Sequence, residues 1–157
     1  MPLYQHVLAA VEATDEGREI LVKAQQVARA TGARLSVLSV VEAPLLTAPV
    51  MADGMIPVTD LPLDASVIRD LQGHAETRLS GWCRQLGIDA RALTVVSDWA
   101  IDRIVHLAKD EDIDLIVIGH HERHGLAAWF RHTDEKVLND APCDVLAVRL
   151  ASPGGAD

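Results

Sequence analysis

The 157-residue sequence is poor in aromatic side chains and cysteines, and it has no long hydrophobic run. Aromatic residues make up 3% of the chain, whereas hydrophobic residues of all kinds make up 49%, so we expect a core built from aliphatic side chains. No apolar run approaches the roughly 20 residues that a membrane-spanning helix needs. The sequence therefore predicts no membrane partner.

The two cysteines and the charge balance exclude further classes of protein and of binding partner. Cys83 and Cys143 have neither CxxC spacing nor a metal-site pattern, and the N-terminus lacks the basic-then-apolar order of a secretory signal. We therefore expect reduced thiols and a cytoplasmic location. The net charge of -9 and the pI near 5.1 repel phosphate surfaces, which argues against nucleic-acid or anionic-membrane partners.

Length and apolar periodicity predict one α/β domain over residues 1–150, followed by a flexible tail at 151–157. Short apolar runs predict strands at 4–11, 34–41, 90–96, 114–118 and 144–150. Apolar residues at helical spacing predict helices at about 16–30, at 66–86, after Asp98, and at 134–139. We expect Thr14 or Asp15 to cap the first helix and Asp98 the third, with Gly32, Gly87 and Pro142 ending elements.

Strands and helices alternate along the whole chain. This alternation predicts parallel strands joined by right-handed crossovers, and hence a three-layer α/β sandwich. Ligands bind beyond the carboxyl ends of such strands, so the HHERHG stretch at 120–125 occupies the expected place of a binding loop.

The segment at 42–64 contains four prolines and one glycine, which no regular helix tolerates. It is predicted to be a long loop. A surface excursion and a lid or partner-contact role both remain open, because Leu45, Met51 and Ile56 would not be needed in a fully solvated loop.

Three stretches carry a resemblance to a known family: YQHVLAAVEATDEG at 4–17, DIDLIVIGHH at 112–121 and EKVLNDAPCDVLAVR at 135–149. With them, nearly the full chain resembles a universal stress protein domain. The resemblance implies a five-stranded parallel sheet of order 3-2-1-4-5, like that of the adenine-nucleotide alpha hydrolases. It also implies a homodimer built by antiparallel pairing of the last strands. The residues matching that edge are Val145, Leu146, Ala147, Val148 and Arg149. Self-pairing would close an apolar edge that otherwise invites aggregation.

The family divides into members that bind ATP and members that do not. Nucleotide-binding members share a Gly, two residues, a Gly, nine residues, then Gly and Ser or Thr, with an Asp ending the first strand. The degenerate site implied here consists of Ala10, Glu12, Val40, Gly119, Glu122, His132 and Thr133. In it, Glu12 replaces the Asp, and Glu122 and His132 replace the second and third glycines. Asp98 and Ala100 stand where a Gly and a Pro commonly open the third helix.

These departures from the nucleotide-binding pattern favour a protein that does not bind ATP. Glycines allow backbone N–H groups to approach phosphate oxygens, whereas Glu122 blocks that approach and adds a like charge. Two like charges about 4 Å apart repel by about 4 kcal/mol at an effective dielectric near 20. The sequence therefore looks like the A-type branch, which binds no ATP. The alternative is an ATP-binding regulator in which Arg123, Arg131 and Thr133 replace the glycines.

The sequence was also searched for metal-binding and catalytic motifs. A zinc site was considered because four histidines lie close together in the sequence: His120, His121, His124 and His132. Adjacent histidines on a loop point in different directions, and no HExxH motif or cysteine partner accompanies them. We therefore expect no metal. No Walker loop, GxSxG elbow or SGGxDS-like loop is present, which predicts no catalytic residue and no enzyme.

The remaining aromatic residues and Cys143 are expected to pack. Trp129 and Phe130 are interpreted as a packing anchor or an interface patch. Trp99 is interpreted as partly filling an empty nucleotide pocket, and Cys143 as packed rather than reactive. The predicted function is that of a stress-response regulator acting as a homodimer through contacts with unknown proteins, without a cofactor.

Overall fold

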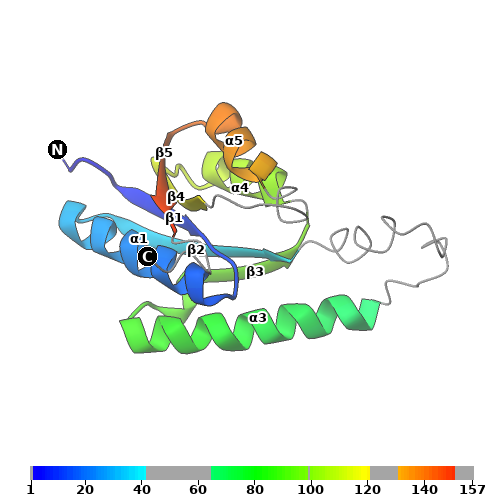
Figure 1. Ribbon diagram of the computed structural model, residues 1–157. Helices are drawn as coiled ribbons and strands as arrows, with labels where there is room; N and C mark the ends of the chain where they lie inside the picture. Colours follow the sequence, from blue (N-terminus) through cyan, green and yellow to red (C-terminus); the bar gives the residue numbers. More distant parts are fainter. Residues whose placement is uncertain (1, 42–64, 99, 121–130, 151–157) are drawn as a thin grey trace, which may run out of the picture.

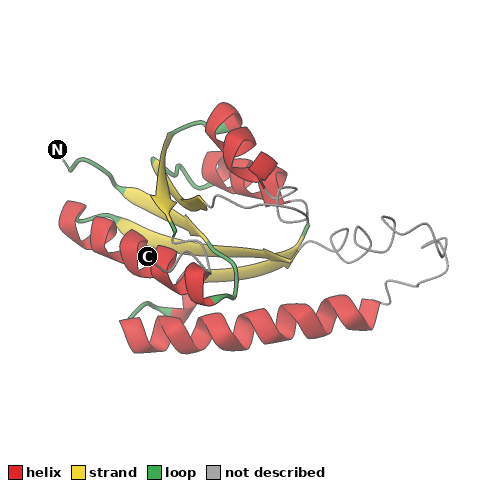
Figure 2. Cartoon of the chain, in the orientation of Figure 1, coloured by secondary structure: helices red, strands yellow, loops and turns green. Residues whose placement is uncertain are grey.

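A computed structural model describes residues 2–41, 65–98, 100–120 and 131–150. Figures 1 and 2 show a central sheet covered by helices on both faces. The strands are β1 (His6–Ala10), β2 (Arg34–Val41), β3 (Leu93–Ser97), β4 (Leu115–His120) and β5 (Asp144–Arg149). The helices are α1 (Asp15–Thr31), α3 (Ala65–Leu86), α4 (Ala100–Asp110) and α5 (Arg131–Asp140), and a short 3-10 helix, η3 (Ala90–Ala92), precedes β3.

The strands lie in the order β3-β2-β1-β4-β5, and every pairing between neighbours is parallel. This confirms the predicted class and strand order. Helices α1 and α3 cover one face of the sheet, whereas α4 and α5 cover the other (Figure 1). Since all strands point the same way, their carboxyl ends meet at one edge of the sheet.

Local signals set the ends of the first helices. The Thr14 hydroxyl accepts a hydrogen bond from the Gly17 amide at 3.1 Å, so Thr14 rather than Asp15 caps α1. Gly32 ends α1 with φ of 72°, and Gly87 follows α3 with φ of 71°, a left-handed conformation that suits glycine. Both predicted helix ends are confirmed.

Two predicted boundaries were wrong. The strand expected at 90–96 begins only at Leu93, because Asp89 accepts the Arg91 amide at 2.9 Å and starts the 3-10 turn instead. The last helix begins at Arg131, earlier than expected, so His132 and Thr133 lie in its first turn rather than in a loop. No apolar periodicity marks that first turn, since the buried Val137 comes later.

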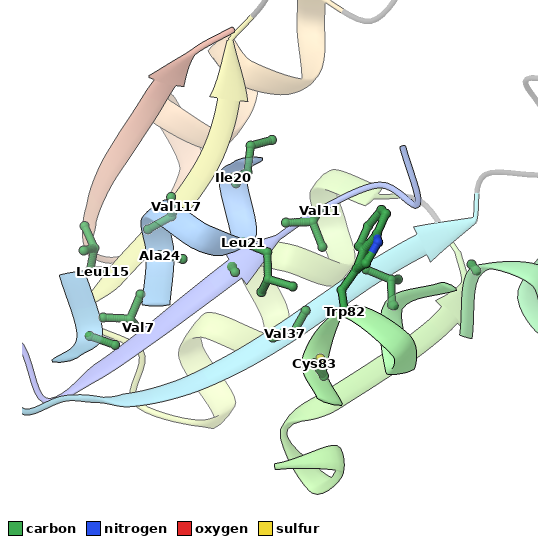
Figure 3. Packing of buried hydrophobic residues seen from close by; sticks show 14 of the residues in the cluster. Val7, Val11, Ile20, Leu21, Ala24, Val37, Trp82, Cys83, Leu115 and Val117 are labelled. Carbon is green, nitrogen blue, oxygen red and sulfur yellow. The ribbon is translucent and has the colours of Figure 1, made fainter. Parts of the chain in front are cut away.

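Alternation along the strands divides the core into two layers. Val7, Ala9 and Val117 pack towards α1 and α3, and Trp82 and Cys83 of α3 join them (Figure 3). On the opposite face, apolar side chains of the strands pack against α4 and α5. The buried members of this second cluster are Leu8, Leu38, Ile104, Ala108, Ile113, Ile116, Ile118 and Val137. The central strands are thus buried on both faces, as their near-continuous apolar sequence predicted.

Several predictions fall outside the described residues. They concern the 42–64 loop, the aromatic residues Trp99, Trp129 and Phe130, the loop position Glu122 and the 151–157 tail. The Asp98 cap of α4 also stays a prediction, because residue 99 beside it is not described.

Candidate functional site

The turn between β1 and α1 is tightly folded at the carboxyl edge of the sheet. The Val11 amide donates to the Leu38 carbonyl at 3.0 Å, which keeps the chain beside β2 after the strand ends. A Cβ atom at position 17 would collide with the backbone carbonyl oxygen of Glu12. Gly17 is therefore required for the turn that positions Glu12 at this edge.

An open groove lies between this turn, the end of β2 and α3. Its volume is about 1020 Å³. The turn contributes Glu12 and Thr14, β2 contributes the segment from Ser39 to Val41, and α3 contributes residues between Arg69 and Arg78. In Figure 1, α3 runs past the tips of β2 and β3. The groove thus lies at the carboxyl ends of β1 and β2, to one side of the switch point between β1 and β4 where such sheets bind ligands.

Arg78 joins the two walls of the groove. Its guanidinium donates to the Ala13 carbonyl oxygen at 2.9 Å and to the Asp15 carboxylate at 2.7 Å. The guanidinium carbon also lies 5.1 Å from the centre of the Trp82 ring, within the range of a cation–π contact. These contacts tie α3 to the turn that carries Glu12.

The charged side chains that line the groove are of both signs. Glu12 and Asp70 supply carboxylates, whereas Arg69 and Arg78 supply guanidinium groups, and Arg78 is already paired with Asp15. Ser39 is 2% exposed and is the buried polar residue among those lining the groove. Among the described residues, the guanidinium of Arg69 has no ion pair, so a ligand with many negative charges would meet this one guanidinium and two carboxylates.

The structure brings together some of the predicted site residues. Ala10, Val40 and Gly119 lie near the carboxyl ends of β1, β2 and β4, and Glu12 follows β1. Glu12 and Val40 line the groove, whereas Gly119 does not. Glu122 lies outside the described residues, and the side chains of His132 and Thr133 are likewise not described.

Gly119 has a packing role of its own. A Cβ atom there would lie 2.5 Å from Cδ1 of Ile20 and 2.8 Å from Cδ1 of Leu150. Both distances are shorter than carbon atoms tolerate, so a side chain at this position would require the terminal methyl groups of Ile20 and Leu150 to move. The presence of this glycine is explained without any bound phosphate.

The predicted interface residues lie on β5, at the edge of the sheet. Val145 packs with the cluster under α4 and α5, while Leu146 and Val148 pack with the cluster under α1. Ala147 and Arg149 are exposed. Within the part of the chain that the structure describes, β5 pairs with β4 alone, so its outer side is free of strand partners.

Three residues of the site were missed from the sequence. Ser39 had a usable signal, since it interrupts the apolar series of Leu35, Val37 and Val41 on one face of β2. Gly17 lies in a polar turn, where a glycine often marks a close approach between two backbone segments. Arg78 had no signal, because its contacts depend on how α3 packs against the turn.

The described residues contain no group of three His, Cys, Asp or Glu side chains that could hold a metal ion. The thiols are also unsuited to reaction. Burial raises the pKa of both Cys83 and Cys143, and the carboxylates of Asp144 and Asp114 raise that of Cys143 further. The described helices include none that is long and apolar enough to cross a bilayer.

The strand order, the two helical layers and the groove at the carboxyl edge define an α/β protein of the adenine-nucleotide alpha hydrolase-like fold. The model of the Universal stress protein family matches residues 3–149, and the chain belongs to that family.

Relatives and solved structures agree with this assignment. The chain is 29% identical to universal stress protein A homolog 1 of Coxiella burnetii over 145 residues, which cover 92% of this chain and 96% of the relative. A hypothetical protein solved as a test case of structural genomics superposes with a TM-score of 0.68 at 16% identity, covering 96% of this chain and 99% of the other. A universal stress protein in complex with cAMP gives a TM-score of 0.54 at 20% identity, covering 92% and 96%. At these identities the structures show a shared fold.

Proposed function

We propose that this protein is a regulatory universal stress protein that acts as a homodimer through protein contacts and without ATP. The observation that carries the proposal is the edge position of β5. Its apolar side chains Val145, Leu146 and Val148 are only partly buried, and its outer backbone groups face no strand among the described residues. Antiparallel pairing of two copies would satisfy those groups and cover the side chains.

Two features support a function without nucleotide. Gly119 is explained by its contacts with Ile20 and Leu150, so it gives no separate support for a phosphate site. Glu12 and Asp70 place two carboxylates at the groove, where the facing guanidinium groups are those of Arg69 and of Arg78, which is paired with Asp15, in a chain whose net charge is -9. Both carboxylates would repel a polyphosphate. The proposal accordingly includes no cofactor, no metal and no enzymatic activity, and it places the dimer in the cytoplasm.

A second candidate is an adenine-nucleotide-binding regulator. The observation in its favour is that Glu12 and Val40, two of the residues predicted for a degenerate nucleotide site, line one groove. One solved relative by fold is in complex with cAMP. In this candidate Arg123, Arg131 and Thr133 would replace the missing glycines.

Two measurements separate the candidates. Sedimentation velocity of the purified full chain should show a dimer of twice 17.0 kDa. Isothermal titration with Mg-ATP and with cAMP should show no binding in the low micromolar range, and mass spectrometry should find no nucleotide retained from cells. Binding of either nucleotide at micromolar affinity would overturn the first proposal and support the second.

A further inference from the structure

Ser39 is a buried polar residue whose hydroxyl has no partner in the described part of the chain. It is 2% exposed and lies on the same face of β2 as Val37 and Val41, the face that packs towards α1 and α3. Among the described residues, Nε of Arg103 is the enclosed side-chain nitrogen or oxygen that lacks a partner. The Ser39 oxygen is therefore not enclosed, and it opens to the groove that Ser39 lines. A buried hydroxyl in this position favours a ligand that forms a hydrogen bond with it.

Glu12 and Ser39 lie side by side at the ends of β1 and β2. The Val11 amide donates to the Leu38 carbonyl at 3.0 Å. Glu12 follows Val11 and Ser39 follows Leu38 in two parallel strands. One donor group of a ligand can thus meet both the hydroxyl of Ser39 and the carboxylate of Glu12.

Carboxylates without partners lie on both walls of the groove. Glu12 belongs to the turn after β1 and Asp70 to α3, and no ion pair or hydrogen bond of either side chain is found among the described residues. The guanidinium of Arg78 is already held by the Ala13 carbonyl and the Asp15 carboxylate. Both walls therefore offer acceptors to a ligand that brings N–H donors.

The charge balance at the groove disfavours anions. Arg69 is the remaining guanidinium, and consecutive helix residues are turned by about 100°, so Arg69 and Asp70 leave α3 in different directions. Counted with Asp15, the partner of Arg78, the groove has three carboxylates against two guanidinium groups, with His74 taken as neutral. In a chain whose net charge is -9, this balance favours a cationic ligand.

Apolar side chains line the rest of the groove. Val41 at the end of β2 and Leu71 on α3 are half-buried, and Ala75, one turn after Leu71, is buried. An apolar ligand body that covers Val41 and Leu71 removes its own surface and theirs from water. The groove thus combines acceptors on two walls with an apolar surface.

We propose that the groove binds an aliphatic diamine. One ammonium group donates to Glu12 and Ser39, the other donates to Asp70, and the carbon chain lies over Val41 and Leu71. Each ammonium has three N–H donors, and its hydrogen bonds to carboxylates are charge-assisted. This inference goes beyond the proposed function and depends on neither the dimer nor the question of ATP.

The test is isothermal titration of the full chain with three probes that share one carbon-chain length and differ in charge: cadaverine, 1,5-pentanediol and glutarate. Cadaverine should bind with a Kd of about 1 mM or tighter at low ionic strength, and added salt should weaken it. Neutral pentanediol and anionic glutarate should bind at least about tenfold more weakly. Equilibrium dialysis with labelled cadaverine detects binding that releases no heat.

Variants with a matched control locate the site. Glu12→Gln and Asp70→Asn should each weaken cadaverine binding by about fivefold, the value of one exposed ion pair. Glu76→Gln is the control, because Glu76 is an exposed carboxylate of α3 that does not line the groove, and it should leave the affinity unchanged.

Ser39→Ala separates a ligand contact from a structural role. It should weaken cadaverine binding by about threefold or more, yet leave the urea unfolding of the free chain unchanged, because the hydroxyl has no partner among the described residues. A loss of stability with unchanged affinity would overturn the role of Ser39 as a ligand contact.

Three results would overturn the diamine site itself. The first is no retention of cadaverine in dialysis. The second is binding of pentanediol or glutarate as tight as that of cadaverine. The third is an equal loss of affinity in Glu76→Gln and Glu12→Gln, which would show a general attraction by the net charge of the chain.

Discussion

The guanidinium of Arg78 stacks over the ring of Trp82, one helical turn further along α3, at 5.1 Å from the ring centre. The same guanidinium binds the Ala13 carbonyl and the Asp15 carboxylate, which belong to the turn and helix after β1. One side chain thus connects three parts of the chain at the groove. It also fixes the spacing between the groove's two walls.

We expect Arg78→Met to lower the free energy of unfolding by about 1 kcal/mol. The variant loses a hydrogen bond to a carbonyl and an ion pair, but the pair is solvent-exposed, which limits its value. Urea unfolding measures the change. Arg69→Met on the same helix is the control, since no hydrogen bond or ion pair of Arg69 with described residues is found, and it should stay within about 0.5 kcal/mol of wild type. Equal losses of unfolding free energy in the two variants would show that the contacts of Arg78 with the turn contribute no stability of their own.

Gly17→Ala should destabilise the fold by about 2 kcal/mol or more, because the new Cβ would overlap the Glu12 carbonyl oxygen and the backbone would have to move. Thermal unfolding would report the loss. Gly81→Ala is the matched control on α3, where nothing lies within 4 Å of the place that a Cβ atom would take. That control should stabilise the chain by up to about 1 kcal/mol, since alanine is the better helix former. A neutral Gly17→Ala would contradict the tight turn.

Gly119→Ala should cost about 1–2 kcal/mol of stability through its contacts with Ile20 and Leu150, whose terminal methyl groups can shift in part. The second-site variant Ile20→Val gives Cβ more room and should restore part of the loss. Chemical denaturation of the single and double variants measures this coupling. Additive losses would show that Gly119 serves something other than packing.

The stability of the chain should fall at alkaline pH. Burial raises the pKa of Cys143 above its ordinary value of 9.0, with Asp144 and Asp114 adding to the effect. The folded thiol therefore keeps its proton where the unfolded thiol loses it, so this stabilisation is complete below pH 9.0 and is lost as pH rises through the folded pKa.

Urea unfolding at several pH values checks this dependence. Between about pH 8 and pH 10.5 the wild type should lose more free energy of unfolding than Cys143→Ala. The Tyr4→Phe variant is a needed comparison, because the hydrogen bond from Tyr4 to Asp144 raises the pKa of Tyr4 in the same direction. Parallel pH profiles for the wild type and Cys143→Ala would contradict the assignment to the thiol.

Val148→Asp should dissociate the proposed dimer, because pairing two β5 strands would bring two new carboxylates into one interface. Sedimentation velocity should show the shift to monomer. Val148 also packs in the core under α1, so a second variant, Ala147→Asp, replaces an exposed residue on the same strand and keeps the core intact. An unchanged sedimentation coefficient for both variants would count against the β5 interface.

Much of the architecture could be predicted from the sequence because its signals are local. The apolar run of β2 matches the observed Arg34–Val41, and glycines mark the ends of α1 and α3. The 3-10 turn before β3 was missed because the Asp89 cap competes with strand propensity. The first turn of α5 was missed because its sequence there is polar and carries no apolar period.

The candidate site was only half predictable. Parallel strands bring Ala10, Val40 and Gly119 to one edge whatever the side chains do, so the edge itself follows from the alternation of elements. The second wall of the groove depends on the position of α3, and the contacts of Arg78 with Ala13 exist only after packing. The packing role of Gly119 likewise depends on how closely Ile20 approaches β4.

The other edge strand of the sheet decides whether the proposed assembly stops at two copies. Strand β3 pairs with β2 on one side, and no described strand covers its second side. A protein that could pair through both edge strands would assemble into a continuous sheet of many copies, whereas a protein that pairs through one edge strand stops at a dimer. β3 has only five residues, and two of them, Thr94 and Ser97, are exposed polar residues. If β5 pairs as proposed, β3 would be the remaining open edge of each copy, where its short length and the exposed Thr94 and Ser97 disfavour further strand pairing.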